Sequence, residues 1–177
     1  MLERLKNKKF YPIAFLTVVV LISVSLLLYI NTFTSEVVEA QNQARIREIL
    51  ESIFPDLTDF EEKENLIVIY EGDSIAGYTF LASGNGYSGA IDMLVGINTD
   101  HTIKDIEILS QTETPGLGSK ITEEEFKDQF TGLAADDIVL SKDGGSIDAI
   151  TGATISSRAV TDTVRQELKN VIDMLSK

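Results

Sequence analysis

The spacing of hydrophobic residues changes several times along this chain, and each change marks a predicted element. Between residues 13 and 30 almost every side chain is aliphatic, and no charged residue occurs from Phe10 to Ser35. Such a run is long enough to cross the hydrocarbon layer of a bilayer as one helix. Residues 37–54 then place apolar side chains on one helical face, and Pro55 helps to end that helix.

The middle of the chain alternates apolar and polar residues with a period of two, as half-buried strands do. The sequence Glu-Gly-Asp-Ser at 71–74 separates the first two of these runs and indicates a hairpin, and a turn at Thr99 and Asp100 separates the last two. A glycine-rich segment at 83–89 lies between the two pairs. The four predicted strands cover residues 66–70, 75–82, 90–98 and 103–110.

The last third of the chain returns to helical spacing. Thr122 followed by Glu125 is typical of a capping box and predicts a short helix. Short strands are expected at 138–140 and 146–150, and a long helix runs from Ile155 towards the C-terminus. The apolar positions of this helix are Val160, Val164, Leu168, Val171, Ile172 and Leu175. This order of elements predicts an α+β fold with a mostly antiparallel sheet flanked by helices, not a doubly wound nucleotide-binding sheet.

Positive charge is concentrated before the aliphatic run, and negative charge after it. The basic residues near the N-terminus are Arg4, Lys6, Lys8 and Lys9. The positive-inside rule therefore predicts a cytoplasmic N-terminus. A cleaved signal peptide is the alternative, but the apolar run is longer than a usual signal-peptide core and no A-x-A-like site follows it. We expect a single-pass protein of the cytoplasmic membrane, with a cytoplasmic segment at 1–9, a transmembrane helix at 10–33 and an extracytoplasmic domain at 36–177.

The composition excludes several kinds of chemistry. The chain contains no cysteine, which excludes disulfides, thiol catalysis, iron–sulfur ligation and c-type haem attachment. Its one histidine, His101, lies in a predicted turn without a partner for metal binding, so we expect no metal site and no catalytic residue. The formal net charge of −13 and the lack of a basic stripe argue against nucleic-acid binding. Any redox function therefore needs a cofactor that is held by other means.

The sequence Asp-Ala-Ile-Thr-Gly-Ala-Thr at 148–154 carries the most specific chemical signal. Thr154 falls in the first turn of the predicted C-terminal helix, where free backbone N–H groups and the helix dipole favour an anion. Gly152 and Ala153 have almost no side chain, so a bulky phosphate donor can reach the Thr154 hydroxyl. An ordinary Thr/Gly turn that caps the helix is the alternative for this segment taken alone.

Residues 113–118, of sequence Glu-Thr-Pro-Gly-Leu-Gly, form a second candidate binding segment. Pro115 restricts the loop, whereas Gly116 and Gly118 allow positive φ values and close approach of the backbone to a flat ligand. Glu113 and Thr114, the first two residues of the loop, supply polar groups beside such a ligand. A plain Pro-Gly turn ahead of a helix would produce the same local pattern.

These two segments, together with the glycine-rich sequence Gly-Tyr-Ser-Gly at 86–89, resemble the FMN-binding domain of the RnfG/NqrC family of membrane-anchored redox subunits. The resemblance covers about residues 83–157 and includes the anchor and its orientation. It implies that a flavin transferase, which consumes FAD, joins FMN through its phosphate to Thr154. The implied flavinylation motif consists of Asp148, Thr151, Gly152, Ala153 and Thr154. The residues implied in FMN binding are Tyr87, Glu113, Thr114, Gly116, Leu117, Gly118, Thr151, Gly152 and Ala153, with Leu117 able to pack on the ring face.

The same resemblance, strongest to the RnfG side of the family, implies an electron-relay subunit of an Rnf-type, ion-translocating ferredoxin:NAD⁺ oxidoreductase. The chain has no nucleotide-binding glycine fingerprint, so the primary substrates are expected to react on other subunits. The implied partners are other membrane subunits of that complex, the flavin transferase and the lipid bilayer. One alternative is the corresponding subunit of the Na⁺-translocating NADH:quinone reductase, which tends to carry more sequence between anchor and flavin motifs. The other is a non-redox, membrane-tethered module of the same fold.

Overall fold

The computed structural model describes residues 15–25, 46–63 and 66–176 of the chain, which divides into two units, Met1–Arg47 and Glu48–Lys177. In the first unit, residues 15–25 are helical. No helix within the described residues is both long enough and apolar enough to cross a membrane. The predicted segment at 1–9 lies outside the described residues, as does much of the predicted transmembrane helix at 10–33.

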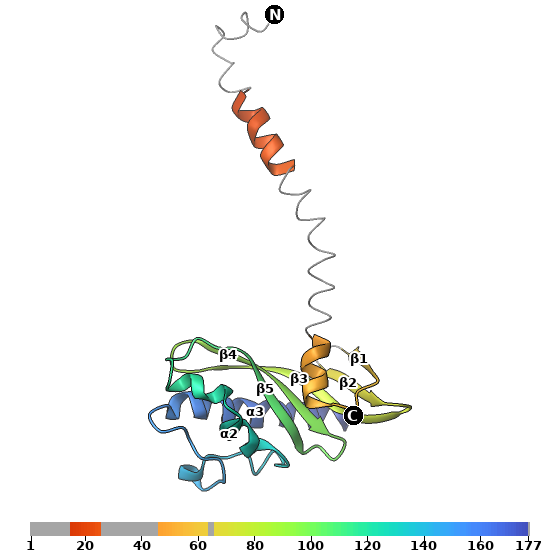
Figure 1. Ribbon diagram of the computed structural model, residues 1–177, viewed down its shortest axis with the longest axis vertical. Coiled ribbons are helices and arrows are strands. Elements are labelled where there is room, and N and C mark those ends of the chain that lie inside the picture. The colour runs from red at the N-terminus through yellow and green to blue at the C-terminus, as the bar shows by residue number, and fades with distance from the viewer. Residues whose placement is uncertain (1–14, 26–45, 64–65, 177) are drawn as a thin grey trace, which may run out of the picture. The chain divides into compact units, whose positions relative to one another are not determined.

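The second unit is built on a five-stranded meander (Figure 1). Each strand pairs antiparallel with the next one in the sequence. The strands are β1 (Asp59–Lys63), β2 (Leu66–Glu71), β3 (Ser74–Asn85), β4 (Ala90–Asn98) and β5 (Ile103–Ser110). The predicted α+β class and the four predicted strands are therefore confirmed. The alternation pattern missed β1, because this exposed edge strand contains one apolar residue, Phe60.

Strand β4 lies at the centre of the hydrophobic core and is covered on both faces. Ile91, Met93, Val95 and Ile97 are fully buried on one face, as their alternation predicts, and they share a core with the long helix α3 (Thr154–Leu175). On the opposite face, the helical residues 48–53 pack through Ile53 on Gly96. A Cβ atom at Gly96 would collide with the Ile53 side chain, so glycine is required for this close packing.

Between β5 and α3 the chain forms short helices instead of further strands. They are η2 (Gly118–Thr122), α2 (Glu124–Lys127), η3 (Asp128–Phe130) and η4 (Ser141–Asp143). The predicted capping box is wrong: α2 starts after Glu123 without a side-chain cap, and the Thr122 hydroxyl donates to the Ser119 carbonyl at 2.9 Å. Thr122 ends the preceding 3₁₀ turn, so its hydroxyl is turned back toward the carbonyl three residues earlier.

The two short strands expected at 138–140 and 146–150 are also not formed. A single parallel bridge joins Leu140 to Ile147, with the Ile147 N–H donating to the Val139 carbonyl at 3.1 Å. Residues 141–146 are too few for the crossover of about a dozen residues or more that parallel strands need. The chain turns instead through η4 and Gly144, which has a φ of 95°. Leu140 and Ile147 still enter the core, and this explains the apolar pattern of both segments.

Candidate functional site

A cleft of about 560 Å³ opens where three segments of the domain meet. They are the turn after β3, the loop after β5 and the first turn of α3. The cleft is lined by Tyr87, Glu113, Thr114, Leu117, Gly118, Gly152, Ala153, Thr154, Ile155 and Ser156. The sequence motifs predict eight of these ten residues and miss Ile155 and Ser156. The volume lies in the range of about 300–1,000 Å³ that is common for small-molecule and cofactor sites.

The buried carboxyl group of Glu113 connects the three walls of the cleft. Its side chain is only 4% exposed; Oε1 accepts a hydrogen bond from the Ser88 N–H at 2.9 Å, and Oε2 accepts one from the Ser156 hydroxyl at 2.5 Å. Gly86 and Gly118 press against this carboxyl group, because a Cβ atom at either position would collide with it. The close approach predicted at Gly118 is therefore present, but it is made to Glu113 and Ser156 of the protein itself.

Two glycines with left-handed backbone shape the cleft in different ways. Gly152 has a φ of 81°, and an added Cβ atom would lie 3.3 Å from Leu117 Cδ2. Gly116 has a φ of 76°, as its place in the predicted turn requires, but it does not line the cleft. Its N–H donates to the Ser119 hydroxyl at 2.9 Å, so it sets the shape of the loop. This turn exposes 45% of Leu117 at the cleft.

Thr154 is the first residue of α3, and its side chain is exposed. The N-cap position is occupied by Ala153, and no side chain of the described residues caps the helix. The side-chain hydrogen bond that an ordinary Thr/Gly cap would make is therefore absent at this helix start. The start of this 22-residue helix lines the cleft together with Thr154, and within the described part of the chain no side-chain hydrogen bond is made at its N-cap. Such a helix end favours an anion through its free N–H groups and its dipole.

Three large hydrophobic side chains remain exposed around the cleft. Tyr87 is 70% exposed, Ile155 55% and Leu117 45%. Exposed apolar groups gathered at one concave site indicate contact with a ligand or partner. Ile155 is out of phase with the buried face of α3, and this is the sequence signal that could have identified it. Ser156 lies four residues before the buried Val160 and therefore on the same face of the helix. A polar residue at such a core-facing position was the sequence signal for a buried hydroxyl.

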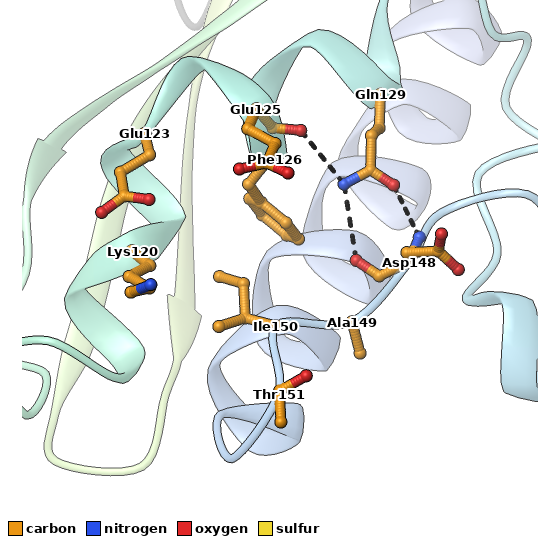
Figure 2. A pocket seen from close by; sticks show the side chains of 9 residues that line it. All are labelled: Lys120, Glu123, Glu125, Phe126, Gln129, Asp148, Ala149, Ile150 and Thr151. Atoms are coloured by element: carbon orange, nitrogen blue, oxygen red, sulfur yellow. Dashed lines mark hydrogen bonds between the residues drawn. The ribbon is translucent and has the colours of Figure 1, made fainter.

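The first half of the 148–154 motif lies outside this cleft. Asp148 and Thr151 line a separate hollow of about 270 Å³, together with Lys120, Glu123, Glu125, Phe126, Gln129, Ala149 and Ile150 (Figure 2). The structure thus divides the motif between two surfaces: residues 148–151 line the hollow, and residues 152–154 line the cleft. Thr151 was predicted among the cofactor-binding residues, and its position separates it from the other predicted residues of that set.

Comparisons with known proteins agree with this geometry. A family model described as an FMN-binding domain matches residues 86–169, from the turn after β3 into α3. The G subunit of an ion-translocating oxidoreductase complex from Methanosarcina acetivorans is 34% identical over 174 residues, covering 88% of this chain and 91% of that protein. The G subunit of a proton-translocating ferredoxin:NAD(+) oxidoreductase complex from Clostridium ljungdahlii is 33% identical over 163 residues, covering 88% of each protein.

The fold has a counterpart among solved structures. The C subunit of the Na(+)-translocating NADH-quinone reductase from Parabacteroides distasonis matches with a TM-score of 0.55 and 25% identity, over 63% of this chain and 62% of that one. Fold and cleft together define an FMN-binding domain of α+β class. The chain belongs to the RnfG/NqrC family, in agreement with the resemblance of its motifs, and its curated relatives are G subunits of ion-translocating oxidoreductase complexes.

Proposed function

We propose that this chain is the electron-relay G subunit of an Rnf-type, ion-translocating ferredoxin:NAD⁺ oxidoreductase, with FMN covalently bound to Thr154. The observation that carries the proposal is the cleft, which combines an uncapped helix start bearing an exposed hydroxyl with an apolar rim. The names and the coverage of the curated relatives support the place of the chain in such a complex. The absence of a nucleotide-binding glycine fingerprint supports substrate reactions on other subunits.

The residues of the cleft fit the two chemically different ends of FMN. A flat, largely apolar ring system suits the rim of Tyr87, Leu117 and Ile155, and a phosphate suits the start of α3. Thr114, Gly152 and Ala153 also line the cleft. Bound FMN would supply one- and two-electron transfer, while the protein orients the ring and shapes its electrostatic surroundings.

The proposed attachment is a phosphoryl-type substitution at Thr154. The hydroxyl oxygen of Thr154 attacks the FMN phosphorus of FAD; a new P–O bond to threonine forms, the bond to the AMP phosphate breaks, AMP leaves, and the hydroxyl proton passes to solvent. The exposed position of Thr154 suits access by a separate flavin transferase. A covalent tether holds the ring at its site at an effective concentration on the order of millimolar, so the remaining contacts can be modest.

We further propose that residues 10–33 anchor the chain in the cytoplasmic membrane, with the N-terminus in the cytoplasm and the domain outside. The basic residues before the aliphatic run support this orientation. Loss of a dissociated cofactor from an extracytoplasmic site is a physical reason for a covalent link. The second candidate function is the NqrC-like subunit of a Na⁺-translocating NADH:quinone reductase, which the structural match supports only secondarily to the G-subunit relatives.

The mass of the intact protein tests the covalent assignment. Protein produced with a flavin transferase should gain the mass of one FMN less one water, and Thr154→Ala should remove the gain. Thr131→Ala is a matched control, because Thr131 is exposed and lies outside the cleft. An unmodified wild-type chain, produced beside a known substrate that the same transferase does modify, would refute the proposal and favour a non-redox module. Assay of the purified complex with reduced ferredoxin and with NADH plus quinone separates the two redox candidates.

A further inference from the structure

The side chain of Gln129 pairs with the backbone of the flavinylation motif across 19 residues of sequence. Its Oε1 accepts a hydrogen bond from the Asp148 N–H at 2.6 Å. Its Nε2 donates to the Asp148 carbonyl at 3.4 Å and to the Glu125 carbonyl at 3.3 Å. Figure 2 shows this amide facing the Asp148 backbone above the small hollow. The contact imitates the pairing of two strands, with one partner supplied by a side chain.

The other contacts of residues 148–153 are packing of Ala149 and Ile150 against the core and hydrogen bonds close to the start of α3. Within the described part of the chain this segment contains no strand; the Ile150 N–H donates to Ser157 Oγ at 3.0 Å, and the Ala153 N–H donates to the Ile150 carbonyl at 2.9 Å. These bonds hold the C-terminal part of the motif to the start of α3. At Asp148, the Gln129 amide is the contact that holds both backbone polar groups.

Gln129 is itself held in place by its neighbours. It lies in η3, and the flanking Phe126 and Phe130 are buried and pack edge to face with ring centroids 5.5 Å apart. The two rings anchor the short helices α2 and η3 in the core, so the amide is presented from a rigid support. Asp148 and Thr151 remain exposed at the hollow, close in sequence to the acceptor hydroxyl but outside the cleft.

We propose that Gln129 is a positioning residue for flavin attachment, whose amide holds the backbone at Asp148 in the shape that the flavin transferase accepts. The inference rests on the proposed link to Thr154. Because residues 148–151 line the hollow and not the cleft, their shape affects the attachment step and not the bound ring. Gln129 thus acts through the Asp148 backbone on the orientation of Thr154 toward the FMN phosphorus of FAD, and it takes no part in the substitution itself.

The test compares three variants as substrates of a flavin transferase with FAD. Gln129→Met keeps the length of the side chain and removes both hydrogen-bonding groups. Gln129→Glu keeps an acceptor for the Asp148 N–H but lacks the donor to the two carbonyl groups. Gln166→Met is the matched control on the exposed side of α3. Attachment is followed by intact mass, and the kcat/KM of the transferase for each variant is compared with the Tm of the same protein.

We expect kcat/KM to fall about tenfold or more for Gln129→Met, because a misplaced reacting group is costly. The kcat/KM for Gln129→Glu should lie between the values for Gln129→Met and wild type. The kcat/KM for Gln166→Met should equal that of wild type. The Tm should not change, since Asp148 is exposed and water can replace the lost bonds. Once loaded, all variants should show the wild-type flavin spectrum and redox potential.

A wild-type kcat/KM for Gln129→Met would overturn the proposal. So would a loss that follows a lowered Tm, because Gln129 would then support folding in general. A shifted potential in the loaded Gln129→Met protein would also contradict the separation of attachment from ring binding. Failure of the wild-type chain to accept FMN would instead refute the covalent assignment at Thr154, so the two failures are distinguishable.

Discussion

The hydroxyl of Ser156 donates a 2.5 Å hydrogen bond to Oε2 of Glu113, which lies 43 residues earlier in the chain. Both groups are buried at the floor of the cleft, with Ser156 1% exposed and Glu113 4% exposed. The bond fixes the first turn of α3 relative to the loop at 113–118. Because Thr154 lies on that turn and Leu117 on that loop, the bond sets the distance between the two ends of the proposed FMN site.

Ser156→Ala should therefore change both stability and cofactor behaviour. The substitution leaves a buried carboxyl oxygen without its partner, which costs about 1–3 kcal/mol of unfolding free energy. Denaturant unfolding measures this loss. FMN should still attach at Thr154, but its redox potential should shift because the loop and the helix are no longer held together. Ser141→Ala, at an exposed position away from the cleft, is the control. A potential equal to that of wild type would show that this bond supports the fold alone.

Leu117→Ala tests whether the loop at 113–118 holds the ring. Leu117 is half exposed, so truncation should cost only about 1 kcal/mol of stability. FMN should remain attached, since the phosphate end is chemically independent of the ring end. The absorption fine structure of the flavin should blur, and its potential should move toward that of free flavin. Leu81→Ala is the matched control, because Leu81 is 67% exposed and lies outside the cleft.

Gly116→Val should have the larger effect of the two loop variants. A β-branched residue is strained at the φ of 76° that Gly116 adopts, although no atom lies within 4 Å of the position that its Cβ atom would take. The strain would displace the turn that presents Leu117. Unchanged flavin spectra and potentials in both loop variants would contradict ring binding by this loop, even with Thr154 modified.

Asp105→Asn should stabilise the domain at neutral pH. Burial raises the pKa of the Asp105 carboxyl group above its ordinary value, against the hydrogen bond from the Ile106 N–H and the charge of Lys127, which lower it. Glu107 and Glu124 raise the pKa further. The stability linked to the protonated form is complete below the ordinary pKa and is lost as the pH rises through the raised pKa. Asparagine is neutral throughout and keeps an acceptor for the Ile106 N–H.

Thermal unfolding over a range of pH measures this effect. The Tm of Asp105→Asn should exceed that of wild type at neutral pH. The difference should shrink as the pH falls through the raised pKa of Asp105 and vanish below the ordinary pKa of the carboxyl group. Asp136→Asn is a control of opposite sign, because the hydrogen bond and charge of Lys169 lower the pKa of Asp136. Asp136→Asn should lose a small amount of stability at neutral pH, because the ion pair between Asp136 and Lys169 is exposed. A Tm difference between Asp105→Asn and wild type that did not vary with pH would contradict the raised pKa of Asp105 as its cause.

The central strands and α3 were predictable because their buried positions recur at the regular spacing of a strand or a helix. In β4, Ile91 and Met93 are buried on either side of the half-buried Asp92, and in α3 Val160 and Val164 repeat at helical spacing. The repeat fails where elements are short: the bridge at Leu140 and Ile147 has the apolar pattern of a strand without its pairing. The transmembrane helix and the orientation of the chain stay predictions.

The cleft was predictable as a set of residues, but its internal connections were not. The glycines and Thr154 mark the site in the sequence because their positions limit side-chain size and backbone shape. The bond from Ser156 to Glu113 and the pairing of Gln129 with Asp148 join residues 43 and 19 positions apart. Such contacts depend on the tertiary arrangement of short helices, which leaves no periodic pattern in the sequence.

The hydrogen bonds of the Glu113 carboxyl group bear on whether the domain folds before or after flavin attachment. This carboxyl group joins the three walls of the cleft through protein groups alone, by way of Ser88 and Ser156. The chain can therefore reach its native shape before any flavin arrives. The proposed attachment of FMN to Thr154 is then a late chemical event on an already folded surface.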